Sequence, residues 1–245
     1  MPSIGQFSNA ASTRQDFPLG KGACWAGTIL RDPTPEVSPH AFYVFQEPHS
    51  VAERHYHDAC QFQVVVHGGG SLGSHDVSPF AVHYAAFQTV YGPLTAGPDG
   101  LGYMTLRIQE GVGVRFWPQT KDRMIQGVRR GQAMAHATVE PNTETGAVTE
   151  LIASEASGLA ARNVRVAPGA AIDLRPEANS AGLFCLLAAG EASLDDVGMA
   201  LLDVAWINRG EASSVRAGED GAQVIIMQMP IEALQDKARL ESATV

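Results

Sequence analysis

The chain has 245 residues, 45% of them hydrophobic and 18% charged, a composition typical of a folded globular protein rather than a disordered or fibrous one. The formal net charge is −9 at pH 7 without a basic stripe, which disfavours nucleic acid and anionic lipid as partners. Three scattered cysteines form neither a disulfide framework nor a zinc knuckle, and residues 1–20 lack the pattern of a secretory signal. We therefore expect a cytoplasmic protein with neither a nucleic-acid nor a membrane partner.

Short apolar segments separated by Gly, Pro, Asp and Asn follow one another along the chain and predict strands. The first half holds four such segments, at 41–45, 60–67, 80–87 and 102–108. The second half holds another four, at 164–167, 183–188, 200–207 and 223–229. This pattern is typical of an all-β sandwich or barrel.

Less regular segments lie between the two halves and at the end of the chain. Residues 117–132 favour one short helix, and the polar, turn-rich stretch 139–150 is a linker. Residues 230–243 begin with proline and carry apolar residues at helical spacing, which predicts a C-terminal helix.

The two halves also match each other. Residues 41–70 align on 161–190 without a gap, which pairs Gly70 with Gly190, and 95–108 align on 216–229. Two collinear matches predict a duplicated barrel. We divide the chain into an N-terminal arm (1–24), a first barrel (25–116), a connector (117–150), a second barrel (151–232) and a C-terminal helix or tail (233–245).

The segment ERHYHDACQFQVVVHGGG, residues 53–70, carries a specific chemical pattern. On one strand His55, His57 and Gln61 share a face, because side chains alternate. Residues two apart on a strand lie roughly 6.5 to 7 Å apart at Cα, a span that two imidazoles can close onto one ion. Gln61 could add a neutral oxygen. The alternative is a barrel without metal, with hydrogen-bonded or exposed histidines and Gln61 at the pocket rim.

The order His-x-His, three residues, Gln, then six residues to Gly68 resembles the first motif of the cupin superfamily. In that motif two histidines, a carboxylate or glutamine and a later histidine hold a divalent metal. With the repeat, the chain resembles a bicupin of the RmlC-like jelly-roll type, well over 41–108 and more weakly over 161–229. The resemblance implies two tandem double-stranded β-helix barrels, a homodimer, and a divalent metal, with Fe²⁺ favoured over Mn²⁺, Ni²⁺ or Zn²⁺.

The sequence departs from the cupin pattern at the second motif, where Tyr91 stands near the place of the usual histidine. His83, about eight residues earlier, is the nearest substitute as a metal ligand, and its alternative role is to line the pocket. Tyr91 could bind substrate or water, and Arg107 could reach an anionic substrate, although either residue could be structural. In the second half the aligned residues are Arg175, Glu177 and Ala181, so that barrel is expected to lack a metal.

Several functions fit these residues. The first is a metal-dependent enzyme on a small organic molecule, above all an iron(II) dioxygenase, and an isomerase or lyase uses the same residues. The second is a binding protein or sensor whose metal is absent or structural. A purely structural or assembly protein is the third. No phosphate-binding loop, nucleophile elbow or catalytic carboxylate pair supports dinucleotide chemistry or serine hydrolysis.

Overall fold

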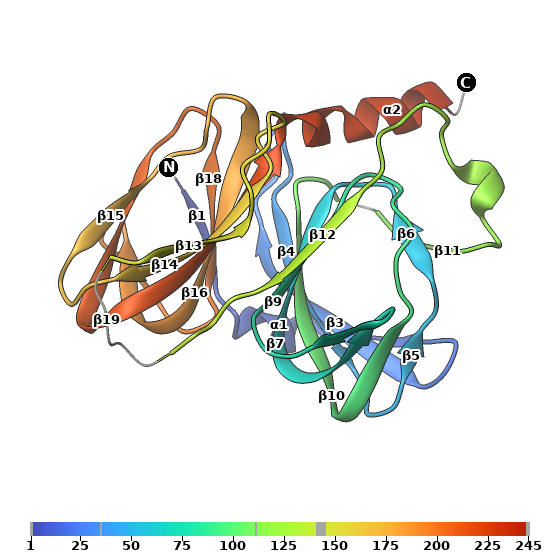
Figure 1. The fold of residues 1–245 in the computed structure, drawn as a ribbon, viewed down its shortest axis with the longest axis horizontal. Helices are drawn as coiled ribbons and strands as arrows, with labels where there is room; N and C mark the ends of the chain where they lie inside the picture. The colour runs from blue at the N-terminus through green and yellow to red at the C-terminus, as the bar shows by residue number, and fades with distance from the viewer. Residues whose placement is uncertain (1, 35, 111, 141–145, 244–245) are drawn as a thin grey trace.

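The chain folds almost entirely into antiparallel strands, which form two large sheets and one small one (Figure 1). The computed structural model describes residues 2–34, 36–110, 112–140 and 146–243. The two large sheets each curl into a jelly-roll barrel, and a short helix closes the chain. The all-β prediction and the C-terminal helix are confirmed.

The first sheet holds nine strands in the order β12-β9-β7-β10-β4-β3-β2, with β5 paired to β10 and β8 to β7. Its strands are β2 (Gln15–Pro18), β3 (Ala23–Arg31), β4 (His40–Gln46), β5 (Val51–Ala52), β7 (Gln61–Leu72), β8 (His75–Val77), β9 (Ala81–Ala85), β10 (Leu94–Arg107) and β12 (Gln132–His136).

The second sheet holds eight strands in the order β1-β18-β16-β19-β14-β13, with β15 paired to β19 and β17 to β16. Its strands are β1 (Ser3–Gly5), β13 (Val148–Ile152), β14 (Ala160–Val166), β15 (Ala171–Leu174), β16 (Ser180–Leu194), β17 (Val197–Met199), β18 (Val204–Asn208) and β19 (Ser213–Pro230).

The remaining elements are short. The strands β6 (His55–His57) and β11 (Val114–Phe116) form a small sheet of their own. The helices are α1 (Asn9–Ser12), the 3₁₀ turns η1 (Lys121–Arg123) and η2 (Ile231–Gln235), and α2 (Asp236–Ala243). The helix predicted within 117–132 is thus a single 3₁₀ turn.

Strands also occur in ranges predicted as arm and connector. β1 and β2 lie within 1–24, and β12 lies within 117–150. β1 crosses to the second barrel, where Ile4 pairs with Ala205. These strands depend on partners far along the chain, which local apolar patterns do not reveal. The division into two domains stays a prediction.

The two barrels pack against each other through one hydrophobic cluster. Phe62 and Met104 of the first barrel and Phe184, Trp206 and Met227 of the second belong to it. These five side chains are all fully buried. The outer faces of β7 and β10 are therefore apolar, which leaves their other face for the interior of the first barrel.

The central strands of the two barrels pair in the same register. Tyr103 lies opposite Val44 in the first barrel, and Val224 lies opposite Val164 in the second. On the other side of the central strand, Gly68 and Gly190 occupy matching positions, opposite Leu101 and Ala222. The ungapped alignment of Gly70 with Gly190 is therefore wrong by two residues, because two extra residues precede β16.

The same correction applies to Gln61. Its counterpart in the second barrel is Leu183 rather than Ala181, since Gln61 pairs with Ala85 and Leu183 with Ile207 at matching positions of β9 and β18.

Gly68 is required by the backbone. Its φ is +62°, and a Cβ at this position would lie 2.2 Å from the carbonyl oxygen of Gly100. We expect Gly68→Ala to lower the free energy of unfolding by about 2 kcal/mol or more, since both the left-handed backbone and the contact penalise alanine. Urea denaturation measures this. Gly198→Ala is the control, because no atom lies within 4 Å of a Cβ there, and an equal loss in both variants would contradict the explanation.

The C-terminal helix is attached to the first barrel by a buried carboxylate. Asp236, 1% exposed, accepts a hydrogen bond from the backbone N–H of Cys60 at 2.8 Å and one from Arg239 at 2.9 Å. Burial is the main cause that raises the pKa of Asp236 to about 6. The folded protein therefore binds this proton more tightly than the unfolded chain does.

A pH dependence follows from Asp236. Between about pH 4 and pH 6 its contribution to stability falls as pH rises, because the folded state holds the extra proton in that range. We expect the free energy of unfolding of wild type, measured relative to that of Asp236→Asn, to fall by about 2 kcal/mol between pH 4.5 and pH 6.5. Urea titrations of both proteins at the two pH values measure this, and a shift in favour of wild type would refute it.

In the part of the chain that the structure describes, none of the helices has the length and apolar character needed to cross a lipid bilayer.

Candidate functional site

The interior of the first barrel holds a polar cluster at one end, and its centre is Tyr91. The rings of His55 and His83 lie 4.6 and 4.9 Å from the ring of Tyr91, and the ring of His57 lies 6.2 Å away. Gln61 donates from Nε2 to the Tyr91 hydroxyl at 2.8 Å. Four residues singled out in the sequence therefore surround Tyr91, namely His55, His57, His83 and Gln61.

The two histidines of β6 lie side by side, with ring centroids 5.3 Å apart. His55 is buried and His57 is half-buried. β6 ends at His57 and β7 begins at Gln61, so the predicted single strand is two strands joined by a bend. Backbone hydrogen bonds between His55 and Tyr91 tie β6 to the segment after β9, which brings the histidines to the polar cluster.

Each of these imidazoles is oriented through its Nδ1 atom. Nδ1 of His55 lies 2.6 Å from the carbonyl oxygen of Glu53, and Nδ1 of His57 lies 3.1 Å from that of Gly113. A carbonyl only accepts, so Nδ1 carries the proton and Nε2 keeps its lone pair. Burial is the main cause that lowers the pKa of both histidines, which keeps them neutral. Histidines that ligate metals are commonly held through the second nitrogen in this way.

Gln61 offers a third atom suited to bind a metal ion, its Oε1. It is 1% exposed, and its Oε1 has no hydrogen-bond partner among the described residues, although its Nε2 is bound by Tyr91. A buried amide oxygen without a hydrogen-bond partner destabilises the folded state. Two neutral imidazole nitrogens and one amide oxygen together fit a divalent transition ion.

His83 lies in the cluster but is engaged elsewhere. Its two ring nitrogens lie 3.0 Å from Oε1 of Gln63 and 3.2 Å from Oε1 of Gln132. Burial is the main cause that lowers the pKa of His83 to about 4, so the ring is neutral. A neutral imidazole donates from one nitrogen and accepts at the other, so one of these two glutamine amides faces the ring with its NH₂ group. The predicted role of His83 as a ligand stays a prediction. Across the described residues, no group of three or more His, Cys, Asp or Glu side chains is placed to hold a metal ion.

Tyr91 is a neutral phenol. It is 3% exposed, and burial is the main cause that raises its pKa far above the ordinary value. An unionised phenol is a poor metal ligand, so Tyr91 serves as a hydrogen-bonding group. Its contact with Gln61 Nε2 fixes the orientation of that amide.

A short strand, β11, pairs with the strand that carries the two histidines. Arg115 of β11 pairs with Asp58, directly after the histidines, at 3.0 Å. Asp58 also accepts from Gln88 at 2.7 Å. The ring of Phe116 lies 6.4 Å from that of His55. These contacts hold β11 against β6.

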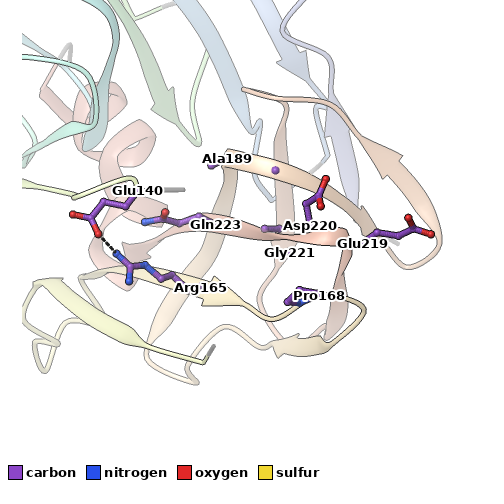
Figure 2. Close-up of a pocket in the computed structure, with 10 residues that line it drawn as sticks. Glu140, Arg165, Pro168, Ala189, Glu219, Asp220, Gly221 and Gln223 are labelled. Carbon is purple, nitrogen blue, oxygen red and sulfur yellow. Dashed lines mark hydrogen bonds and ion pairs between the residues drawn. The ribbon is translucent and has the colours of Figure 1, made fainter. Parts of the chain in front are cut away.

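Among the surface cavities outside the polar cluster, one adjoins the first barrel and one lies on the second. One, of about 470 Å³, is lined by Gly113, Asp58, Arg115 and residues of the C-terminal helix. It therefore adjoins Gly113, whose carbonyl contacts Nδ1 of His57. The other, of about 450 Å³, lies on the second barrel, where Arg165 pairs with Glu140 (Figure 2). It shares no lining residue with the polar cluster.

The second barrel has an apolar interior at the matching positions. Leu183, Cys185 and Ala205 stand where the first barrel has Gln61, Gln63 and His83. These three side chains belong to a buried apolar cluster. The fold therefore does not need polar groups at these positions, so the polar cluster of the first barrel is a candidate functional site.

Sequence reasoning missed several contributors to this site. Gln63 could have been found, because it shares the strand face of Gln61. Gln132 and Gly113 have no local signal, since they reach the site from β12 and from the loop before β11.

Comparisons with known proteins show the fold. No protein-family model and no curated protein sequence matches the chain. A solved structure of an oxalate decarboxylase is similar with a TM-score of 0.60 and 14% identity, covering 93% of this chain and 77% of that one. A Bacillus subtilis oxalate decarboxylase studied for its Mn(II) centres is similar with a TM-score of 0.59 and 13% identity, covering 90% and 76%.

A bacterial pirin from Escherichia coli in complex with nickel(II) is also similar, with a TM-score of 0.58, 10% identity and coverage of 94% and 99%. Both kinds of protein have the cupin-type fold. At these identities the likeness establishes that fold and nothing more about this chain.

Proposed function

We propose that this chain is a bicupin whose first barrel binds a divalent metal and catalyses a reaction of a small organic molecule, namely an iron(II)-dependent dioxygenation. One observation carries the proposal: His55 and His57 lie together as neutral imidazoles, each held through Nδ1 with Nε2 left for a ligand. The neighbours described with manganese and nickel add support for a divalent ion in this fold.

The metal would be held by Nε2 of His55, Nε2 of His57 and Oε1 of Gln61. When bound, a divalent ion surrounded by neutral donors supplies strong Lewis acidity and, as iron(II), redox chemistry with O₂. Fe²⁺ is our first choice, with Mn²⁺, Ni²⁺ and Zn²⁺ as alternatives. Tyr91 orients Gln61 through the hydrogen bond from Nε2, and β11 holds the strand of the two histidines in place.

Oxygen consumption tests the reaction type. Protein purified without oxygen and loaded with Fe²⁺ should consume O₂ in the presence of an enolisable or phenolic compound, and His57→Ala should not. Turnover of such a compound without O₂ uptake would instead identify a metal-dependent isomerase or lyase. Bound metal without turnover would remove the enzymatic proposal.

A metal-free binding protein is the second candidate. It is favoured by the engagement of both nitrogens of His83 and by Tyr91 in the place of a histidine, which leave two histidines for a metal. Ligand affinity that is unchanged after metal removal would support it. A homodimer, a cytoplasmic location and the assignment of 25–116 and 151–232 as separate barrel domains remain predictions under either function.

A further inference from the structure

The guanidinium of Arg107 is buried in the first barrel without a counter-ion. Arg107 is 6% exposed, and its Nε and Nη1 atoms have no hydrogen-bond partner among the described residues. No carboxylate forms an ion pair with it in the described part of the chain. Burial lowers the pKa of Arg107 only to about 10, so it is charged at neutral pH.

The groups around Arg107 favour one kind of partner. Its Cζ lies 4.8 Å from the centroid of the Phe42 ring, so an aromatic side chain covers one face. His40, the cross-strand neighbour of Arg107, has a buried Nδ1 that also lacks a partner. Burial, together with the charge of Arg107, lowers the pKa of His40 to about 4, so this ring is neutral and can donate from Nδ1. Unpaired donors therefore meet at one place.

Arg107 belongs to the same interior as the histidine pair. It lies on β10 two residues after Thr105, which pairs with Gln63, and on the face opposite the buried Leu106. Its charge also contributes to the lowered pKa of His57 and acts on Tyr91.

The second barrel shows that this charge is not needed for folding. The matching residue there is Gln228, whose amide is satisfied by the backbone of Glu177 and Gly158. An unpaired buried guanidinium is unfavourable for folding, whereas a planar carboxylate matches its fork of N–H donors.

We infer that Arg107, with His40, is the subsite for a carboxylate of the substrate, so that the molecule acted on in the first barrel is a small carboxylic acid. The inference rests on the proposed function for one further contact of the substrate: an oxygen next to its carboxylate would reach the metal held by His55 and His57. Gln61 and Tyr91, on the same interior, are 1% and 3% exposed, so we expect the acid to be small.

Binding of glycolate, with glycolamide as its neutral analogue, tests the inference. Isothermal titration and thermal shifts at constant ionic strength would compare the two probes on wild type, Arg107→Gln and His55→Ala/His57→Ala, each with and without Mn²⁺. We expect wild type to bind glycolate at least about 10-fold more tightly than glycolamide, and Arg107→Gln to lose this preference. Arg107→Lys should retain part of it.

The outcomes separate this inference from the proposed function. Glycolate binding that persists in the double histidine variant, with Mn²⁺ binding lost, supports both assignments. Glycolate preference in a wild type that binds no metal supports the carboxylate subsite and removes the metal proposal. Equal binding of both probes by wild type overturns the carboxylate subsite even if Arg107→Gln does not fold, and so does an unchanged preference in a folded Arg107→Gln.

Discussion

His57→Ala is expected to lower the affinity of the protein for Mn²⁺ or Ni²⁺ by at least about 10-fold, because it removes one of only two imidazole ligands. The Nδ1 contact with Gly113 O that orients this ring is lost with it. Titration of the metal-free protein with either ion, followed by calorimetry or by the electron paramagnetic resonance signal of free Mn²⁺, measures the effect.

His67→Ala is the matched control, since His67 is an exposed histidine of the same barrel. It should bind metal as wild type does. Equal metal affinity in His57→Ala and wild type would show that this ring is not a ligand.

The second large effect is expected from Gln61→Leu/Tyr91→Phe, which replaces a buried polar pair with apolar side chains. Leu183 already fills the position of Gln61 in the second barrel. Removing an unpartnered amide oxygen together with the hydroxyl that binds its Nε2 should leave the free energy of unfolding unchanged or raise it by about 1 to 3 kcal/mol. Metal affinity should fall by about 10- to 100-fold.

Opposite changes in stability and affinity distinguish a functional pair from a structural one. Urea denaturation and metal titration of the same samples give both quantities. Gln223→Leu is the control, because Gln223 is buried in the second barrel and donates to Thr138 O and Asn163 Oδ1. It should lose stability and keep metal affinity. A double variant that loses stability and binds metal normally would assign Gln61 and Tyr91 a structural role.

The sequence predicts the centre of the site because its signal is local. His55 and His57 are two residues apart on one strand, so alternation alone places both rings on one face. Gln61 belongs to the same motif as the histidines, and Tyr91 stands at the second motif of the same half of the chain. Arg107 lies at the end of an apolar strand, where a charged residue is unusual enough to be noticed.

The contacts that define how these residues act come from distant segments. The carbonyl of Gly113, which orients His57, lies 56 residues further along the chain. Gln132 reaches His83 from a strand in the predicted connector. His40 has no motif around it, and only the pairing of β4 with β10 places it beside Arg107. Such partners are fixed by sheet register, which a single sequence does not specify.

The duplication could be detected from the sequence, but its detail could not. The turn glycines and apolar runs reveal two similar halves. The two additional residues before β16 shift the match, and only the paired positions of Gly68 and Gly190 reveal the shift. The contrast between a polar and an apolar barrel interior depends on this corrected match.

Elemental analysis tests the central claim most directly. Protein purified without oxygen and without a histidine tag would be analysed beside His55→Ala/His57→Ala. We predict near-stoichiometric iron, manganese, nickel or zinc in wild type and at least about a 10-fold loss in the variant. No metal in either protein, with reconstitution also failing, would contradict the metal site and leave a metal-free binding protein.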